Sequence, residues 1–286
     1  MADDRGLMTD GYIDLHASPL APGRSPVRIR YRDAGSGPPV VFLHGGWGYE
    51  FYPFDGQTSV LEARHRVLIP DRTGYGRSGA LDVQRPDFHR RAAEETLSTL
   101  DTLHVDRAAF WGHSDGAVIA LWIAVLAPDR VTAVVAEATH YFRKKPRSRA
   151  FFETMRDAPE ELGARVAAAL EGHHGSRWRS LIQTNGEAWL RIADEAASDA
   201  ADLYDERLAE IVRPVLLVHG RKDPRTEPGE LDALRAALER HGAATGLLLL
   251  DEGAHSPHTE AATAERVTRE ATAFLDGADG ADGADS

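Results

Sequence analysis

The chain has 286 residues, of which 42% are hydrophobic, and this supports one large α/β domain or two small ones. Its 45 acidic residues outnumber its 33 basic residues, and the net charge of −12 argues against nucleic acid as a partner, because phosphate contacts need clustered lysine and arginine. Cysteine is absent, which excludes disulfides and metal sites built on thiolates.

The same composition bears on where the protein works. No run of about 18 uninterrupted apolar residues occurs, so no membrane span is expected. The acidic N-terminus is followed by no long apolar stretch, and hence no secretory signal is expected. Together with the lack of cysteine, these features favour a cytoplasmic protein.

The first part of the chain predicts strands of two kinds. Strands are first predicted at residues 13–16 and 27–32. In residues 27–32, apolar residues alternate with arginine, which is typical of a half-buried antiparallel strand. Residues 40–43 and 66–70 are almost continuously apolar, as in strands that are covered on both faces in a parallel sheet.

Helices and strands then alternate along much of the remaining chain. Such a pattern implies right-handed crossovers and a doubly wound sheet, and the fold class is therefore α/β. The predicted elements are helix 87–103, strand 107–112, helix 116–127, strand 131–138, strands 214–220 and 246–250, and helix 259–275.

Residues 140–212 interrupt this alternation with helical patterns and no strand candidate. An insertion at this point predicts a helical cap over an active site, and an ordinary surface insertion is the alternative. Its aromatic residues favour the cap, because apolar cover excludes water and shapes a pocket. Residues 1–139 and 213–276 then form the core, and the polar, Gly-rich repeat in 277–286 predicts a disordered tail.

The pentapeptide Gly-His-Ser-Asp-Gly at residues 112–116 joins a predicted strand to a predicted helix. This pattern is typical of a nucleophile elbow, in which a tight turn exposes the serine, here Ser114. An acid and then a histidine must follow at later strand ends. Asp223 and His255 each lie just after a predicted strand, in the order that an α/β-hydrolase requires.

A serine hydroxyl is a poor nucleophile, so it needs a base, a group that orients the base, and donors for the oxyanion. We assign His255 as the base and Asp223 as its orienting acid. The backbone N–H groups of Asp115 and Gly46 are the predicted oxyanion hole. Trp47, in the glycine-rich loop beside Gly46, is a candidate substrate-binding residue.

These segments together resemble the α/β-hydrolase superfamily over nearly the whole chain. The resemblance implies an α/β-hydrolase fold with a mostly parallel sheet and an inserted helical cap, and it implies no cofactor. Members that act on epoxides or haloalkanes use an aspartate nucleophile, whereas position 114 is serine. The matching motifs are His44-Gly45-Gly46, Asp-x-x-Gly-x-Gly-x-Ser at 71–78, the elbow, His219-Gly220 with Asp223, and Gly253-Ala254-His255.

The Ser-Asp-Gly of the elbow, with a cap after the sixth strand, looks similar to the biphenyl-hydrolase-like group. That resemblance implies hydrolysis of small esters, including α-amino acid esters, with Asp115 holding the amino group. A carboxylate beside the nucleophile disfavours anionic substrates. The alternative is a charge that a neighbouring donor holds. Ala117 departs from the group, which carries a second glycine there.

Glu137, His140 and Tyr141 follow the sixth predicted strand and are further candidates for the substrate pocket. A metal site has little support, because the adjacent His173 and His174 point in different directions.

The sequence thus predicts a serine hydrolase that forms an acyl-enzyme with a small-molecule ester and has no nucleic-acid or membrane partner. A lactone hydrolase or carbon–carbon bond hydrolase with the same triad is one alternative. A non-catalytic ligand-binding homologue is the other. The oligomeric state stays open.

Overall fold

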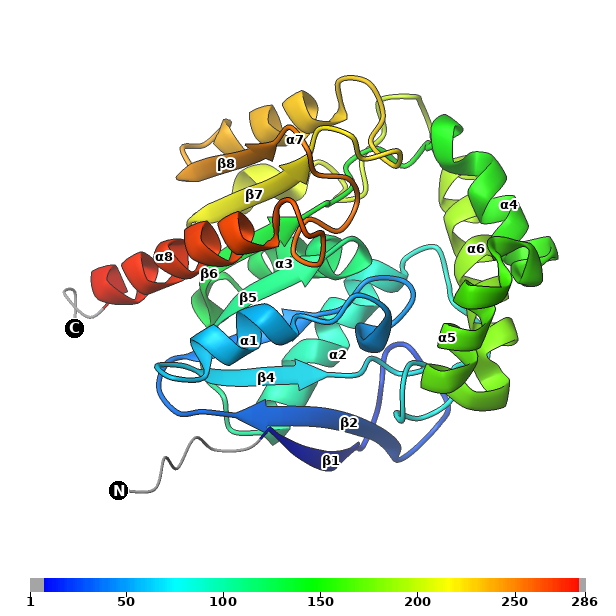
Figure 1. Cartoon of the computed structure of the whole chain (residues 1–286), viewed down its shortest axis with the longest axis horizontal. Coiled ribbons are helices and arrows are strands. Elements are labelled where there is room, and N and C mark those ends of the chain that lie inside the picture. The colour runs from blue at the N-terminus through cyan, green and yellow to red at the C-terminus, as the bar shows by residue number, and fades with distance from the viewer. Residues whose placement is uncertain (1–7, 283–286) are drawn as a thin grey trace.

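An eight-stranded sheet runs through the centre of the molecule (Figure 1). The structure is a computed structural model, and it describes residues 8–282. The strand order is β1-β2-β4-β3-β5-β6-β7-β8, and only β2 runs against the others. The strands are β1 (Thr9–Leu15), β2 (Val27–Ala34), β3 (Pro39–Leu43), β4 (Arg66–Pro70), β5 (Ala108–His113), β6 (Val131–Glu137), β7 (Val215–Gly220) and β8 (Thr245–Leu250).

Helices cover both faces of this sheet, as the apolar strands predict. One face packs against α2 (Phe88–Thr102), α3 (Asp115–Leu126) and α7 (Glu230–Glu239). The other face packs against α1 (Asp55–Leu61) and α8 (Ala264–Asp282). Alternate residues of one strand serve the two layers, since Val41 and Leu43 of β3 face the first and Val40 and Phe42 the second. The α/β prediction is confirmed.

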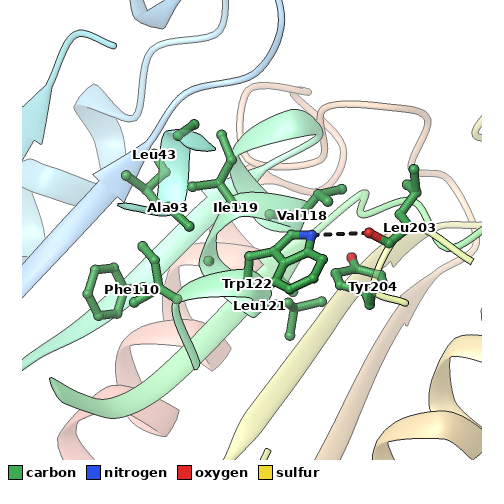
Figure 2. Close-up of a cluster of buried hydrophobic side chains, with 14 of the residues drawn as sticks. Leu43, Ala93, Phe110, Val118, Ile119, Leu121, Trp122, Leu203 and Tyr204 are labelled. Carbon is green, nitrogen blue, oxygen red and sulfur yellow. Dashed lines mark hydrogen bonds between the residues drawn. The ribbon is translucent and has the colours of Figure 1, made fainter. Parts of the chain in front are cut away.

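Side chains of helix α3 lie in a cluster of buried hydrophobic residues that belongs to the first layer (Figure 2). Eleven of its twelve residues are buried, which makes it a core helix rather than an amphipathic surface helix. Its Trp122 donates a hydrogen bond from Nε1 to the carbonyl oxygen of Leu203, at 3.1 Å (Figure 2). This bond fixes the chain that leads from the 140–212 segment back into the sheet.

The half-buried pattern predicted for β2 is wrong at two of its arginines. Arg28 is exposed, but Arg30 and Arg32 are only 8% and 6% exposed. Each guanidinium lies within 3.4 Å of a carboxylate oxygen of Asp71, just after the neighbouring β4. A charged side chain can be buried when it is paired in this way, and an alternating pattern contains no sign of such a partner.

Three helices of the 140–212 segment, which we call the cap, lie beyond the carboxyl ends of the parallel strands (Figure 1). They are α4 (Arg149–Asp157), α5 (Ala164–His174) and α6 (Trp178–Asp194), with short 3-10 turns between them. All residues of the cap are described, and none belongs to a strand of the sheet.

The last helix is longer than predicted. α8 continues to Asp282, so residues 277–282 are helical where the polar repeat predicts disorder. Phe274 and Ala278 pack against the core cluster under the helix, and this contact extends it. The rest of the predicted tail, 283–286, lies outside the described residues. Within the described part of the chain, no helix is both long and apolar enough to cross a membrane.

Candidate active site

Ser114 lies in the sharp turn between β5 and α3. Its backbone has φ 54° and ψ −121°, a conformation that L-residues adopt rarely and that stores strain at functional sites. A side chain at Gly112 would collide with the carbonyl of Gly116, and one at Gly116 with the carbonyl of Leu43. The Ser114 N–H donates to the carbonyl oxygen of Glu137 at 2.9 Å. Both glycines of the predicted elbow are thus sterically required.

The structure brings Ser114, His255 and Asp223 together. The Oγ of Ser114 lies 3.1 Å from Nε2 of His255. On the other side of the ring, Nδ1 lies 2.9 Å and 3.0 Å from the two carboxylate oxygens of Asp223. Burial of Asp223 opposes its ionisation, but attraction to His255 and hydrogen bonds from His255 and the Arg225 N–H outweigh it, so its pKa lies well below the ordinary value.

Two loops hold the acid and the histidine in register. Lys222, in the loop after β7, donates its backbone N–H to the carbonyl of Gly253 in the loop after β8, at 2.9 Å. The carboxylate of Glu260 accepts hydrogen bonds from the N–H groups of Ala254 and Ser256, at 2.7 Å and 2.9 Å. These two bonds flank His255 and fix its backbone. The ring is therefore placed by main-chain bonds on both sides.

Gly46 and Asp115, the predicted oxyanion residues, both line a cavity above Ser114. Asp115 is the first residue of α3, and the first N–H groups of an α-helix have no partner within it. A Cβ at Gly46 would lie 2.8 Å from Oδ2 of Asp115, so glycine is needed there. Arg72 holds the loop by donating to the carbonyls of His44 and Gly45, at 2.6 Å and 3.1 Å.

The carboxylate of Asp115 is buried and already has three hydrogen-bond donors. Oδ1 lies 3.2 Å from both Nε2 of His89 and Nε1 of Trp189. Oδ2 accepts from Nδ2 of Asn185 at 3.3 Å. Burial opposes its ionisation, but these bonds and the charge of Arg72 outweigh it and lower the pKa of Asp115. Asp115 is thus an ionised group, held by donors from α2 and the cap helix α6.

The remaining walls of the cavity are largely aromatic. The cap contributes the rings of Phe152 and Trp189, which stack with centroids 5.2 Å apart and planes 5° apart. Trp47, a predicted substrate-binding residue, lines the cavity, and its ring centroid lies 5.8 Å from that of Phe151. Apolar walls around a few polar groups are typical of a small-molecule site.

Of the three substrate-pocket candidates that follow the sixth strand, the structure places one at the cavity and two away from it. His140 lines the cavity, with Nε2 3.5 Å from Oγ of Ser114, and burial together with nearby cations lowers its pKa well below the ordinary value. Glu137 and Tyr141 do not line the cavity. The Glu137 carboxylate is fully buried and accepts a bond from Nδ1 of His258 at 2.7 Å, and the ring of Tyr141 packs against Phe142. The predicted substrate-binding roles of Glu137 and Tyr141 do not agree with the structure, because the Glu137 side chain turns inward and the Tyr141 side chain lies along the cap.

Sequence reasoning missed four polar residues of the site: His89, Asn185, Tyr52 and Arg225. His89 and Asn185 lie on helices far from the elbow in sequence and reach it only through the packing of α2 and α6. Arg225 carried a signal, since it stands two residues after Asp223 and lines the same cavity. Across residues 8–282, no group of three or more histidine, cysteine, aspartate or glutamate side chains is arranged to hold a metal ion.

Comparison with known proteins gives a family and several relatives. Residues 40–269 match the model of the "Alpha/beta hydrolase family". The chain is 33% identical over 235 residues to a haloalkane dehalogenase of Mycolicibacterium paratuberculosis, covering 74% of this chain and 76% of that protein. It is 26% identical over 238 residues to the serine hydrolase BPHL of Mus musculus, covering 81% and 78%.

Other matches are shorter or show the fold alone. The chain spans only 38% and 35% of the lengths of two epoxide hydrolases, from Siraitia grosvenorii and Mycobacterium tuberculosis. A solved haloalkane dehalogenase loop variant from Bradyrhizobium elkanii superposes with a TM-score of 0.72, at 18% identity, over 97% of this chain and all (100%) of that one.

Proposed function

This protein belongs to the alpha/beta hydrolase family and is a hydrolase, and we propose that it cleaves small carboxylic esters through an acyl-enzyme on Ser114. One observation carries the proposal: Oγ of Ser114 lies 3.1 Å from Nε2 of His255, whose Nδ1 is bonded to Asp223. A nucleophile in contact with a base that a third group orients is the arrangement needed for covalent acyl transfer.

The first step forms the acyl-enzyme. Oγ of Ser114 attacks the ester carbonyl while His255 takes its proton at Nε2. Asp223 stabilises the imidazolium through the bond to Nδ1, and its lowered pKa keeps it ionised. The N–H groups of Asp115 and Gly46 bind the oxyanion. His255 then passes the proton to the departing alcohol.

The second step hydrolyses the acyl-enzyme. His255 takes a proton from water, the hydroxide attacks the acyl carbonyl, and the acid leaves as Ser114 regains its proton. The aromatic walls of the cap limit how much water surrounds the intermediate. His140 is neutral because of its lowered pKa, so it adds no competing charge beside the imidazolium.

The identity of the nucleophile favours ester cleavage over the hydrolysis of epoxides or haloalkanes, the reactions for which several relatives are named. Residue 114 is serine, and the adjacent carboxylate of Asp115 is held by His89, Trp189 and Asn185 rather than aimed at His255. Hydrolysis of epoxides or haloalkanes through an aspartyl-ester intermediate needs a free carboxylate at the elbow, and Asp115 does not provide one.

For α-amino acid esters, the relevant atom is Oδ2 of Asp115. It accepts one 3.3 Å bond from Asn185, whereas a carboxylate oxygen can accept about two. It also faces Gly46, beside the proposed oxyanion hole. An α-ammonium group on the acyl part of the substrate would find this oxygen near the scissile carbonyl.

The test combines labelling and turnover. The protein is treated with a fluorophosphonate probe, the modified peptide is identified by mass spectrometry, and neutral p-nitrophenyl esters are assayed with wild type and Ser114→Ala. Labelling at residue 114 and ester turnover are expected in wild type and should be lost in Ser114→Ala. Ser59→Ala, an exposed serine on α1, is the matched control and should label normally. If Ser114 is not labelled, the protein is better described as a non-catalytic ligand-binding homologue. If Ser114 is labelled but only lactones or carbon–carbon bond substrates are turned over, a lactone hydrolase or a carbon–carbon bond hydrolase is favoured.

A further inference from the structure

Arg225 is a charged side chain in the cavity that is attracted by the carboxylate of Asp223 but forms no direct ion pair with it. It lines the cavity with Ser114 and His255. Its guanidinium carbon lies 3.1 Å from the centroid of the Phe151 ring. Within the described part of the chain, no ion pair or side-chain hydrogen bond involves this guanidinium. Most of the arginine is buried, so solvent compensates its charge only in part.

The neighbouring cations behave differently. Arg221 and Lys222 lie on the same loop but are exposed, and they pair with Asp251 and Glu252. Lys145, at the start of the cap, is buried and pairs with Glu230, with Nζ 2.5 Å from Oε2. Arg225 is only partly buried, and its guanidinium keeps N–H donors that no described residue accepts and that a ligand could use.

The position of Arg225 is tied to the triad. Its backbone N–H donates to Oδ1 of Asp223 at 2.8 Å, so one turn fixes both the acid and the arginine. The side chain reaches the cavity between Phe151 of the cap and Tyr52 of the core. A group held by this guanidinium would therefore lie in the space that also holds Ser114.

Asp115 and Arg225, which both line the cavity, differ in their hydrogen bonding. The carboxylate of Asp115 is matched by three donors and by the nearby charge of Arg72. The guanidinium of Arg225 stacks on the Phe151 ring and is attracted by Asp223, but no acceptor among the described residues bonds to it. Burial lowers the pKa of Arg225 to about 10, so it stays protonated at neutral pH. Among the described residues, the guanidinium of Arg225 therefore keeps hydrogen-bond donors that no protein group uses.

We propose that Arg225 binds a carboxylate on the substrate, and that esters carrying such a carboxylate, for example half-esters of dicarboxylic acids, are preferred over their neutral counterparts. The planar guanidinium can donate two parallel hydrogen bonds to a carboxylate while it stacks on Phe151. The inference rests on the ester hydrolysis proposed for Ser114. It reverses the expectation that Asp115 excludes anions, because the donors around Asp115 already offset that charge.

Kinetics on matched ester pairs test this inference. Monoethyl succinate, glutarate and adipate carry a carboxylate in the acyl part, and 3-acetoxypropanoate carries it in the alcohol part. Ethyl butyrate, valerate and hexanoate and propyl acetate are their neutral partners. Hydrolysis is followed by pH-stat for wild type, Arg225→Gln, Arg225→Lys and the control Arg221→Gln. The readout is the ratio of kcat/KM between each anionic ester and its neutral partner.

Wild type should prefer at least one anionic ester, and Arg225→Gln should lower that ratio roughly 10- to 100-fold, the range expected for a hydrogen-bonded charge. Most of the loss should appear in KM, since the contact is made equally in ground and transition states. Arg225→Lys should keep part of the preference, and Arg221→Gln all of it. An equal loss for anionic and neutral esters would mean that Arg225 only pins the cap through Phe151. That result, or an unchanged ratio, overturns the inference.

A binding measurement separates this inference from the proposed function. If Ser114 reacts with fluorophosphonate but no ester is hydrolysed, glutarate should still slow the labelling of wild type at concentrations roughly tenfold lower than for Arg225→Gln. If Ser114 does not react, calorimetric titration with glutarate replaces the labelling assay. Equal affinity of glutarate for the two proteins overturns the assignment of Arg225 in either case.

Discussion

Replacement of Asp115 tests the hydrogen-bond network beside the nucleophile. Asp115→Ala removes the carboxylate and leaves donors of His89, Trp189 and Asn185 buried without an acceptor. An unsatisfied buried donor costs about 1–3 kcal/mol, so the free energy of unfolding should fall by about 3 kcal/mol or more. That is a large part of the ~5–15 kcal/mol that stabilises a typical domain.

Asp115→Asn is the milder change, and it should cost less. Its amide oxygen can still accept from His89 and Trp189, and Asn185 can turn its own amide to accept the new N–H. Tyr75 can then donate its hydroxyl hydrogen to Oδ1 of Asn185, while the turned Nδ2 loses its bonds to Asp115 and Tyr75. A loss of about 1–2 kcal/mol is expected, since bonds to a charged acceptor become bonds to a neutral one.

Urea unfolding of both variants measures these differences, with the exposed Asp251→Ala as the control. The same proteins are assayed with p-nitrophenyl esters of alanine and of propionic acid. If Oδ2 holds an ammonium group, Asp115→Asn lowers the ratio of kcat/KM for the alanyl and propionyl esters about 10- to 100-fold. An unfolding free energy of Asp115→Ala close to that of the control would refute the network. An unchanged ester ratio would refute the ammonium role.

Three further predictions follow from single contacts. Gly116→Ala should prevent formation of the elbow and abolish fluorophosphonate labelling of Ser114, because the new Cβ would collide with the Leu43 carbonyl. The control is Gly56→Ala on α1, where a Cβ has no atom within 4 Å, and this variant should fold and be labelled at Ser114 normally. Trp122→Phe loses the bond to Leu203 and should lower the urea unfolding free energy by about 1–3 kcal/mol without loss of Ser114 labelling. Glu137 has a lowered pKa because attraction to His258 and its hydrogen bonds outweigh burial, so the native state binds fewer protons than the unfolded one. Ionised Glu137 therefore stabilises the native state above the ordinary glutamate pKa of about 4.3, and this stabilisation is lost as pH falls through the native pKa. In Glu137→Gln, the free energy of unfolding obtained from urea unfolding should depend less steeply on pH between pH 5 and pH 3. An unchanged pH dependence would contradict this assignment.

Local patterns predicted the sheet and the elbow because their causes lie within a few residues. Continuous apolar runs such as 40–43 must be covered on both faces wherever they occur. The glycines of 112–116 are required by the turn itself. Asp223 and His255 could be placed because parallel strands end at one edge of the sheet, so loops distant in sequence meet there.

The misplaced or missed residues depend on partners far away in the chain. Glu137 reads as a strand-end carboxylate, and only the position of His258, 121 residues later, turns it away from the cavity. The burial of Arg30 depends on Asp71, which no alternating pattern contains. The helical start of the predicted tail depends on the contact of Ala278 with the core.

The bonds from α6 to Asp115 limit how far the two parts of this protein can be exchanged with those of a relative. Asn185 and Trp189 belong to the cap, while the carboxylate that they hold belongs to the core. A chimera that receives a foreign cap without matching donors inherits a buried charge stripped of two of its hydrogen bonds. Cap and core are therefore coupled through these bonds, and a graft needs either a cap with matching donors or the exchange of Asp115 together with α6.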